Sequence, residues 1–147
     1  MPKSQPAAAE AVMTITADVS FLLVIRRFVQ AAAANFDVAD AAIEDVVHAV
    51  DELSANAILH GYQGAPGWLE IRCRPDGDAL VVTLCDQTPP FDPTTVPEPD
   101  LDVPLDQRRI GGLGIYLSRK MMDEMRYQRL PSGANELTLV KRGARPA

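Results

Sequence analysis

The chain has little cysteine and little histidine: Cys73, Cys85, His48 and His60 are the full set in 147 residues. Neither cysteine has a partner at the short spacing that metal sites use, and neither histidine has a second ligand nearby in sequence. No Ser-His-Asp or Cys-His catalytic set can be assembled from them. The sequence therefore predicts no disulfide and no structural metal centre, and we expect both cysteines to be buried free thiols.

Long apolar runs and an excess of basic charge are also missing. No run approaches the roughly 20 residues that a membrane-spanning helix requires. The N-terminus lacks the basic segment and apolar stretch of a secretory signal. The formal net charge of -6 argues against general nucleic-acid binding, which needs a basic face. These absences predict a cytoplasmic protein without direct contacts to nucleic acid or membrane.

The length suits one compact domain spanning residues 1–147. We expect residues 1–10 to form a disordered leader and residues 142–147 to form a tail. Residues 88–110 contain six prolines, at positions 89, 90, 93, 97, 99 and 104. A loop of this length inside a small domain is typical of a functional lid or of a disordered segment.

Hydrophobic periodicity predicts five helices or strands before the lid and three after it. The predicted elements are a strand over 11–16, a helix from Asp18 or Ser20 to Asn35, a helix capped by Asp40 and ended by Gly61, a hairpin over 68–74 and 79–85, a helix from the glycines at 111–114 to about Glu124, and strands over 125–130 and 136–140. This order predicts an α+β fold, a two-layer α/β sandwich with a mixed, mostly antiparallel sheet and helices on one face.

The hairpin has a predicted register, with Asp76-Gly77 as a two-residue turn. Apolar residues then pair on one face, as Leu69 with Leu84, Ile71 with Val82, and Cys73 with Leu80, while Cys85 faces Trp68. Asp86 has the parity of the apolar set, so it points to the covered face, where an unpaired carboxylate is costly. Either a nucleobase amino group or a backbone turn could supply the hydrogen bonds that it needs.

Two side chains of the second helix, Glu52 and Asn56, are four residues apart and share one helical face. An asparagine can offer its carbonyl oxygen to Mg²⁺, which prefers oxygen ligands. A glutamate can orient or deprotonate an attacking hydroxyl. The alternative interpretation is a solvated helix flank with no chemical role.

Glycines 111, 112 and 114 stand where the predicted lid meets a helix. Glycine allows a close approach of backbone to a phosphate, and a helix N-terminus favours anions. Arg108 and Arg109 could add positive charge beside them. The alternative is a hinge next to solvated arginines.

Taken together, these segments resemble the N, G1 and G2 boxes of the GHKL (histidine-kinase-like) ATPase superfamily. Within it, the chain is similar to the anti-sigma-factor serine/threonine-protein kinases of bacteria. The similar segments are 50–62, 111–117, 122–127 and 133–141, and the likeness runs from about Thr14 to Lys141. The resemblance implies a Bergerat-type fold that binds ATP between the helical layer and the lid.

The resemblance also implies a role for each matching residue. Glu52 would be the base for a protein serine hydroxyl, Asn56 would ligate Mg²⁺, and Asp86 would bind the adenine amino group. The phosphates would be bound by Arg109, Gly111, Gly112, Leu113 and Gly114. The implied partners are a sigma factor and a STAS-type anti-sigma-factor antagonist, and many members of the family are homodimers.

Thr88 departs from the family pattern, because a glycine usually stands at this position after the aspartate. A side chain here would crowd the adenine or stiffen the turn, and a β-branched residue resists positive φ. The leading hypothesis is a serine kinase that uses ATP and Mg²⁺ and sequesters a sigma factor. The alternative is a non-catalytic protein-interaction module with weak or no ATP binding. A third hypothesis, the ATP domain of a histidine kinase, would need a phosphoacceptor domain in trans.

Overall fold

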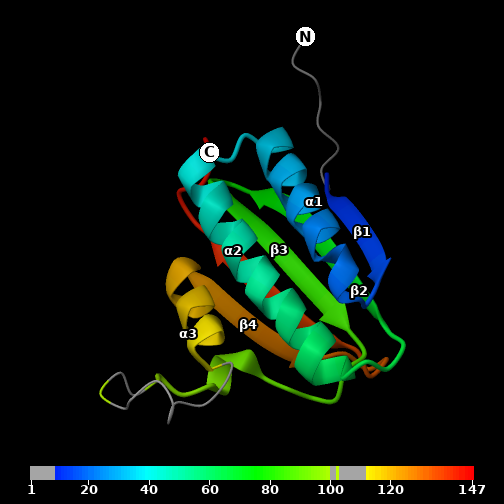
Figure 1. Ribbon diagram of the computed structural model, residues 1–147. Helices are drawn as coiled ribbons and strands as arrows, with labels where there is room; N and C mark the ends of the chain where they lie inside the picture. Colours follow the sequence, from blue (N-terminus) through cyan, green and yellow to red (C-terminus); the bar gives the residue numbers. More distant parts are fainter. Residues whose placement is uncertain (1–8, 100–101, 103–111) are drawn as a thin grey trace.

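The computed structural model describes residues 9–99, 102 and 112–147. Within these residues, five strands form one sheet in the order β1-β2-β3-β5-β4, and helices α1, α2 and α3 cover one of its faces (Figure 1). The elements are β1 (Ala11–Thr16), α1 (Leu22–Asn35), α2 (Asp40–Asn56), β2 (Trp68–Asp76), β3 (Ala79–Asp86), α3 (Gly112–Met121), β4 (Glu124–Arg129) and β5 (Asn135–Lys141). The predicted α+β class is confirmed, although all four strand pairings are antiparallel, so the sheet is not mixed.

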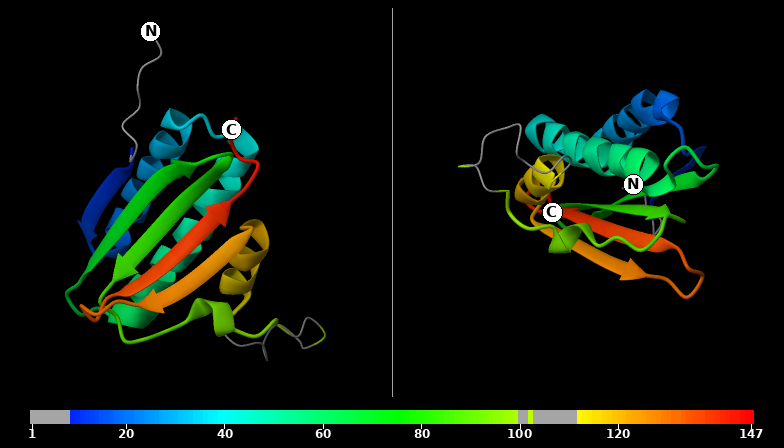
Figure 2. Two further views of the ribbon diagram at one scale, coloured as in Figure 1. Left: turned by 180° about the vertical axis from the view of Figure 1, so that it is seen from behind. Right: turned by 60° about the horizontal axis from the view of Figure 1, so that its bottom comes forward.

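The main core lies between the sheet and the helices, with α2 in the middle of the helical layer (Figure 1). Alternate residues of each strand face this core, as the period of two in a strand requires. The largest fully buried side chains include Ile25 and Val29 of α1, Val46 and Val50 of α2, and Ile71, Leu80 and Leu139 of the sheet. Figure 2 shows from two further sides that α1, α2 and α3 all lie on the same face of the sheet.

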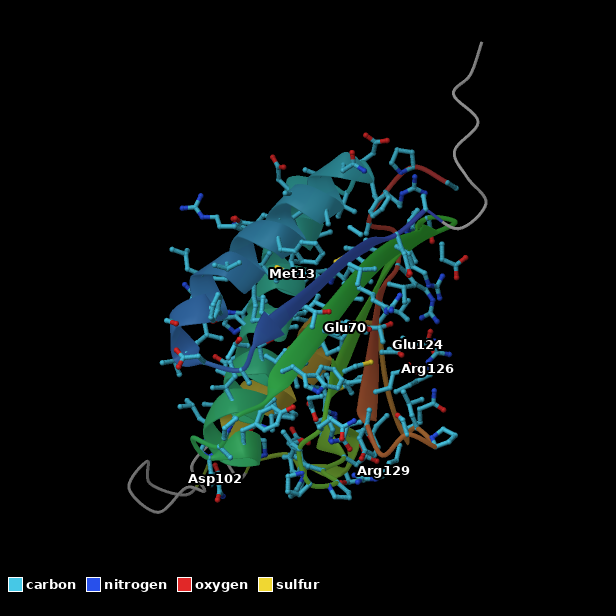
Figure 3. All side chains as sticks on the ribbon, turned by 90° about the vertical axis from the view of Figure 1, so that its right-hand side faces the viewer. Met13, Glu70, Asp102, Glu124, Arg126 and Arg129 are labelled. Carbon is cyan, nitrogen blue, oxygen red and sulfur yellow. The ribbon has the colours of Figure 1, made fainter. Side chains whose placement is uncertain are left out.

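That opposite face is mostly polar, as the sequence predicts. Figure 3 shows Met13 between β1 and the helices, and Glu124 and Arg126 on the side away from them. Arg72 pairs with Glu70 at 2.7 Å and with Glu10 at 2.6 Å. Such partly exposed pairs contribute little stability. One small apolar cluster of Ala79, Val81 and Val140 interrupts this face.

The hairpin register differs from the prediction by two residues. The turn is Gly77-Asp78, with Gly77 at φ +58°, because glycine takes the first central position as in a type II′ turn. The observed pairs are therefore Ile71 with Leu84, Cys73 with Val82, and Cys85 with Glu70 rather than Trp68. Since the shift is an even number, every side chain keeps its predicted face.

The two cysteines are free and buried, as predicted. Cys73 lies on the helix-covered face and Cys85 on the opposite one. Burial raises the pKa of the Cys73 thiol to about 12. Burial, with the nearby Glu136 carboxylate, raises the pKa of Cys85 to about 11. Both thiols stay protonated at neutral pH, so neither is a reactive nucleophile.

The predicted helix ends need three corrections. Asp40 is the first residue of α2, with Ala39 at the cap position, and its carboxylate still favours the helix N-terminus. Gly61 does not end this helix, which continues as a π-helical turn, η2 (Ala57–Tyr62), to Gln63 at φ +52°. Helix α3 ends at Met121 rather than near Glu124, because Glu124 already pairs with Val140 in the sheet.

The predicted tail over 142–147 packs against the domain. Ala144 is only 2% exposed and belongs to the main core. Its N–H donates to Asp78 O at 2.9 Å, and its carbonyl accepts from Ala39 N at 2.8 Å. Arg145 Nε donates to Phe36 O at 2.7 Å. The segment therefore joins the loop between α1 and α2 to the turn of the β2–β3 hairpin.

Deletion of residues 142–147 should lower the free energy of unfolding by about 2–4 kcal/mol, because it removes several hydrogen bonds worth roughly 1 kcal/mol each and uncovers the core around Ala144. Urea denaturation of the purified shortened chain measures this loss. Deletion of residues 146–147 alone is the control and should change the free energy little. Equal stability of the two shortened chains would contradict the interpretation.

Candidate functional site

A cavity of about 350 Å³ opens at one end of the sheet, between the C-terminal part of α2, η2 and the segment that follows β3. This volume falls in the range of roughly 300–1,000 Å³ that is typical of small-molecule sites. Apolar side chains form its inner walls, among them Leu53, Ile71, Leu84 and Leu137. Polar residues also line it, among them Asn56, His60, Asp86, Thr88 and Asn135. Phe91, 46% exposed, lies at its mouth.

Asp86 contributes a carboxylate to this cavity, at the end of β3 and on the predicted face. Its Oδ1 accepts three hydrogen bonds, from Thr88 N at 3.0 Å, Thr88 Oγ1 at 2.7 Å and Asn135 Nδ2 at 2.8 Å. Among the residues that the structure describes, no hydrogen bond to Oδ2 is found. The carboxylate thus has one saturated oxygen and one that can accept a hydrogen bond from a ligand.

Asn135 is a site residue that sequence reasoning missed. It is the residue of β5 directly opposite Asp86, and it is only 5% exposed. Its amide nitrogen also donates to Thr88 O at 2.9 Å, and its Oδ1 accepts from Tyr127 Oη at 2.5 Å. The predicted last strand begins one residue too late, at Glu136, which left Asn135 outside the sheet. Only the long-range β3–β5 register identifies it.

Tyr62 was also missed. Its hydroxyl accepts from Gln87 N at 2.8 Å and donates to Trp68 O at 2.8 Å. These bonds fix the backbone immediately after Asp86 against the start of β2. A Cβ on Gly67 would overlap the Tyr62 ring, so a glycine is needed beside it.

Thr88 is buried, with 6% of its surface exposed. Within the described part of the chain, Asp37 and Gln63 are the non-glycine residues with positive φ, so Thr88 does not adopt the backbone conformation that it would resist. Its methyl group packs on Gly61, where an added Cβ would lie 2.5 Å from Thr88 Cγ2 and 2.9 Å from Thr88 Cβ. Gly61 is therefore required for close approach rather than for ending a helix.

Glu52 and Asn56 lie on successive turns of α2. Asn56 lines the cavity, whereas Glu52 faces α3. A Cβ on Gly114 would overlap Glu52 Oε2, so glycine allows α3 to approach this carboxylate. Because Gly114 is in the first turn of α3, Glu52 lies near the partial positive charge of that helix N-terminus.

The glycine loop is only partly described. Gly112 begins α3, and a Cβ there would meet no atom within 4 Å. Leu113 is 37% exposed. Arg109 and Gly111 lie outside the described residues, as do Arg108 and much of the predicted lid. Residues 88–99 of the predicted lid are held to α3 by two hydrogen bonds. Arg119 Nη1 donates to Val96 O at 2.6 Å, and Tyr116 Oη donates to Glu98 Oε1 at 2.8 Å.

The described residues contain no group of three His, Cys, Asp or Glu side chains that could hold a metal ion by themselves. Asn56 lines the cavity and has an amide oxygen of the kind that can ligate a metal ion. In the same part of the chain, no helix is long and apolar enough to cross a membrane.

Known proteins with similar sequences match most of the chain. A family model described as a histidine kinase-like ATPase domain matches residues 15–141. The serine-protein kinase RsbW of Bacillus subtilis is 32% identical over 122 residues, which cover 79% of this chain and 76% of that protein. The anti-sigma F factor of a Thermoanaerobacter species is 26% identical over 117 residues, covering 79% of this chain and 81% of that protein.

A solved structure has a similar fold. The crystal structure of the RsbU and RsbW domains of a Mycobacterium tuberculosis protein superposes with a TM-score of 0.65 and 20% sequence identity. The match covers 95% of this chain but 34% of the longer one, so this chain spans about a third of that protein.

Because Gly61 and Thr88 are in contact, substitutions at the two positions should have strongly non-additive effects on the free energy of unfolding. Gly61→Ala should cost roughly 1–3 kcal/mol in the wild-type background, because the hydrogen bonds of Thr88 Oγ1 prevent its methyl group from turning away. The same change in a Thr88→Gly background should cost little or be stabilising. Denaturant unfolding of the four proteins in the cycle measures the coupling. An equal cost of Gly61→Ala in both backgrounds would contradict the contact.

Proposed function

The chain belongs to the histidine kinase-like ATPase family, and on that premise we propose that it is an ATP-dependent anti-sigma-factor serine kinase. In this proposal it sequesters a sigma factor and phosphorylates a STAS-type antagonist of its anti-sigma activity. One observation supports the proposal most directly. In a largely apolar cavity of about 350 Å³, Asp86 Oδ1 accepts three hydrogen bonds from the protein, which leaves Oδ2 to accept one from a ligand. The names of the relatives, a serine-protein kinase and an anti-sigma factor, support the regulatory role.

Asp86 Oδ2 would accept a hydrogen bond from the amino group of adenine. The apolar side chains that line the cavity, such as Leu53, Ile71 and Leu137, would pack against the faces of a purine ring. The saturated Oδ1 keeps the carboxylate from turning, so one oxygen meets the base. Thr88 does not have a positive φ, so its backbone is not strained in this arrangement.

The phosphates would extend from the base toward Asn56 and the N-terminus of α3, where backbone N–H groups and the helix dipole favour anions. Because no closed set of carboxylates is found in the described residues, Asn56 would share Mg²⁺ with phosphate oxygens and water, which is the usual mode for this ion. Bound Mg²⁺ would neutralise charge on the phosphates. Arg109, Gly111, Gly112, Leu113 and Gly114 complete the proposed phosphate site.

Glu52 would accept the proton of the substrate serine as that oxygen bonds to the γ-phosphorus and the bond to the ADP oxygen breaks. It is one helical turn from Asn56, so the base and the proposed metal ligand lie on the same side of α2. The close approach of Gly114 to Glu52 Oε2 supports this role, because it would keep the carboxylate beside the proposed phosphate site.

The partners of this activity would be a sigma factor, bound as the inhibited protein, and the antagonist, bound as the phosphoryl acceptor. We further propose that the chain acts in the cytoplasm, where transcription factors of this class function, and that it forms a homodimer. Analytical ultracentrifugation with and without ATP tests the dimer.

Asp86→Asn should abolish measurable ATP binding. The three donors around Oδ1 would select the amide oxygen of the new residue, so its NH₂ group would face the amino group of adenine as a second donor. Calorimetric titration with ATP, with and without Mg²⁺, compares the variant with the wild type. If the wild type does not bind millimolar ATP, the alternative of a non-catalytic interaction module replaces the kinase.

Glu52→Gln should lower the rate of phosphoryl transfer by about 100-fold or more, because it removes the general base, while ATP affinity changes little. The measurement is transfer of labelled γ-phosphate to the antagonist protein, followed by mass spectrometry of the modified serine. Glu44→Gln is the matched control, with the same charge change at an exposed position of the same helix. Wild-type transfer by the Glu52 variant would exclude Glu52 as the base.

A further inference from the structure

We propose that Thr88 and Asn135 are positioning residues that set the base selectivity of the site by fixing the orientation of Asp86. Their three hydrogen bonds to Asp86 Oδ1 are called the Asp86 clamp here. The inference rests on the proposed function, since it concerns how the proposed ATP site reads the base. It assigns a task to a residue that stands in place of a glycine and to one at the start of β5.

The amide of Asn135 has a fixed orientation. Its nitrogen meets a carboxylate oxygen, Asp86 Oδ1, and a carbonyl oxygen, Thr88 O, and neither of these carries a proton. Its oxygen meets two donors, Tyr127 Oη at 2.5 Å and Arg129 Nη1 at 3.5 Å. Rotation of the amide by 180° would place its oxygen against Asp86 Oδ1 and Thr88 O, which are themselves acceptors. The amide nitrogen therefore stays beside Asp86.

Asn135 therefore acts through Asp86 and not on the ligand. The amide has two N–H protons, and they are shared among three acceptors, the third being Thr88 Oγ1 at 3.0 Å. Its oxygen is occupied by Tyr127 and Arg129. With the side chain 5% exposed, no hydrogen-bonding group of Asn135 remains for a nucleotide.

Thr88 contributes through both branches of its side chain. The hydroxyl accepts from Asn135 Nδ2 and donates to Asp86 Oδ1, so it links the two residues. The methyl group packs on Gly61, which holds the hydroxyl in the rotamer that reaches Asp86. A glycine at position 88 would leave the backbone N–H but remove the hydroxyl donor and the packing.

The clamp has a consequence for base selectivity. A fixed Oδ2 accepts from an exocyclic amino group, as in adenine, and repels a carbonyl oxygen at the same place, as in hypoxanthine. A carboxylate released from its donors can turn toward the ring N–H that hypoxanthine carries. Loss of the clamp should therefore reduce the preference for ADP over inosine diphosphate, whereas a general loosening of the cavity would weaken both ligands together.

The experiment measures ADP and inosine diphosphate affinities by calorimetry on the full-length protein. Asn135→Leu should lower the ADP preference about tenfold, because it removes a hydrogen bond to a charged group, and Thr88→Val should lower it about threefold. Thr88→Val keeps the packing on Gly61 and loses the hydroxyl. Thr88→Ser keeps the hydroxyl and should restore the preference.

Two controls separate the clamp from folding effects. Thr83→Val makes the same chemical change on the face of β3 away from the cavity and should leave both affinities unchanged. Circular dichroism and thermal unfolding identify a variant that is not folded. If Asn135→Leu does not fold, the Thr88 pair alone decides the outcome.

Each outcome of the titrations is decisive. A reduced ADP preference in Thr88→Val with recovery in Thr88→Ser supports the clamp. An unchanged preference in Thr88→Val, or an equal loss of both ligands, overturns the clamp and leaves the proposed kinase in place. If the wild type binds neither nucleotide, the proposed function fails and the clamp fails with it.

Discussion

The site depends on the antiparallel pairing of β3 with β5, which places Asp86 opposite Asn135. A carboxylate at the end of a central strand, on the covered face of the sheet, would be costly without donors. The pairing supplies one donor from β5, and the turn after β3 supplies two from Thr88. The same pairing builds the inner wall of the cavity from Leu84 and Leu137, so the polar and apolar parts of the site share one register.

The second constraint is the close approach of backbone to side chain at two glycines. At Gly61, η2 packs directly on Thr88, and at Gly114, α3 packs directly on Glu52. The π-helical turn continues α2 beyond Asn56 and so forms the wall that Thr88 contacts. The first approach holds the segment after β3 against η2 at the cavity, and the second holds the start of α3 against α2. Longer side chains at either glycine would separate these layers.

Periodicity was sufficient to predict the fold class, the faces of the strands and the inward direction of Asp86, because each depends on local alternation. It was insufficient for the hairpin register, since moving the turn by one residue, from Asp76-Gly77 to Gly77-Asp78, shifts each cross-strand partner by two residues and leaves the faces the same. Gly61 was read as a helix end because glycine has that local meaning, whereas its actual role depends on Thr88, 27 positions away. Asn135 was missed for the same reason, since its partner Asp86 is distant in sequence.

Thr88 illustrates how a departure from a family pattern can be accommodated at a second position. An added Cβ at position 61 would lie 2.9 Å from Thr88 Cβ, so the conflict already arises with the smallest side chain at both positions. One of the two residues must therefore be glycine. With glycine at 88, the turn is permissive and Asp86 loses a hydroxyl donor. With glycine at 61, as here, η2 leaves room for a side chain at position 88. The hydroxyl of that side chain can then donate to the Asp86 carboxylate. Thr88 and Gly61 thus form one structural unit, in which the glycine leaves the room that the threonine needs beside Asp86.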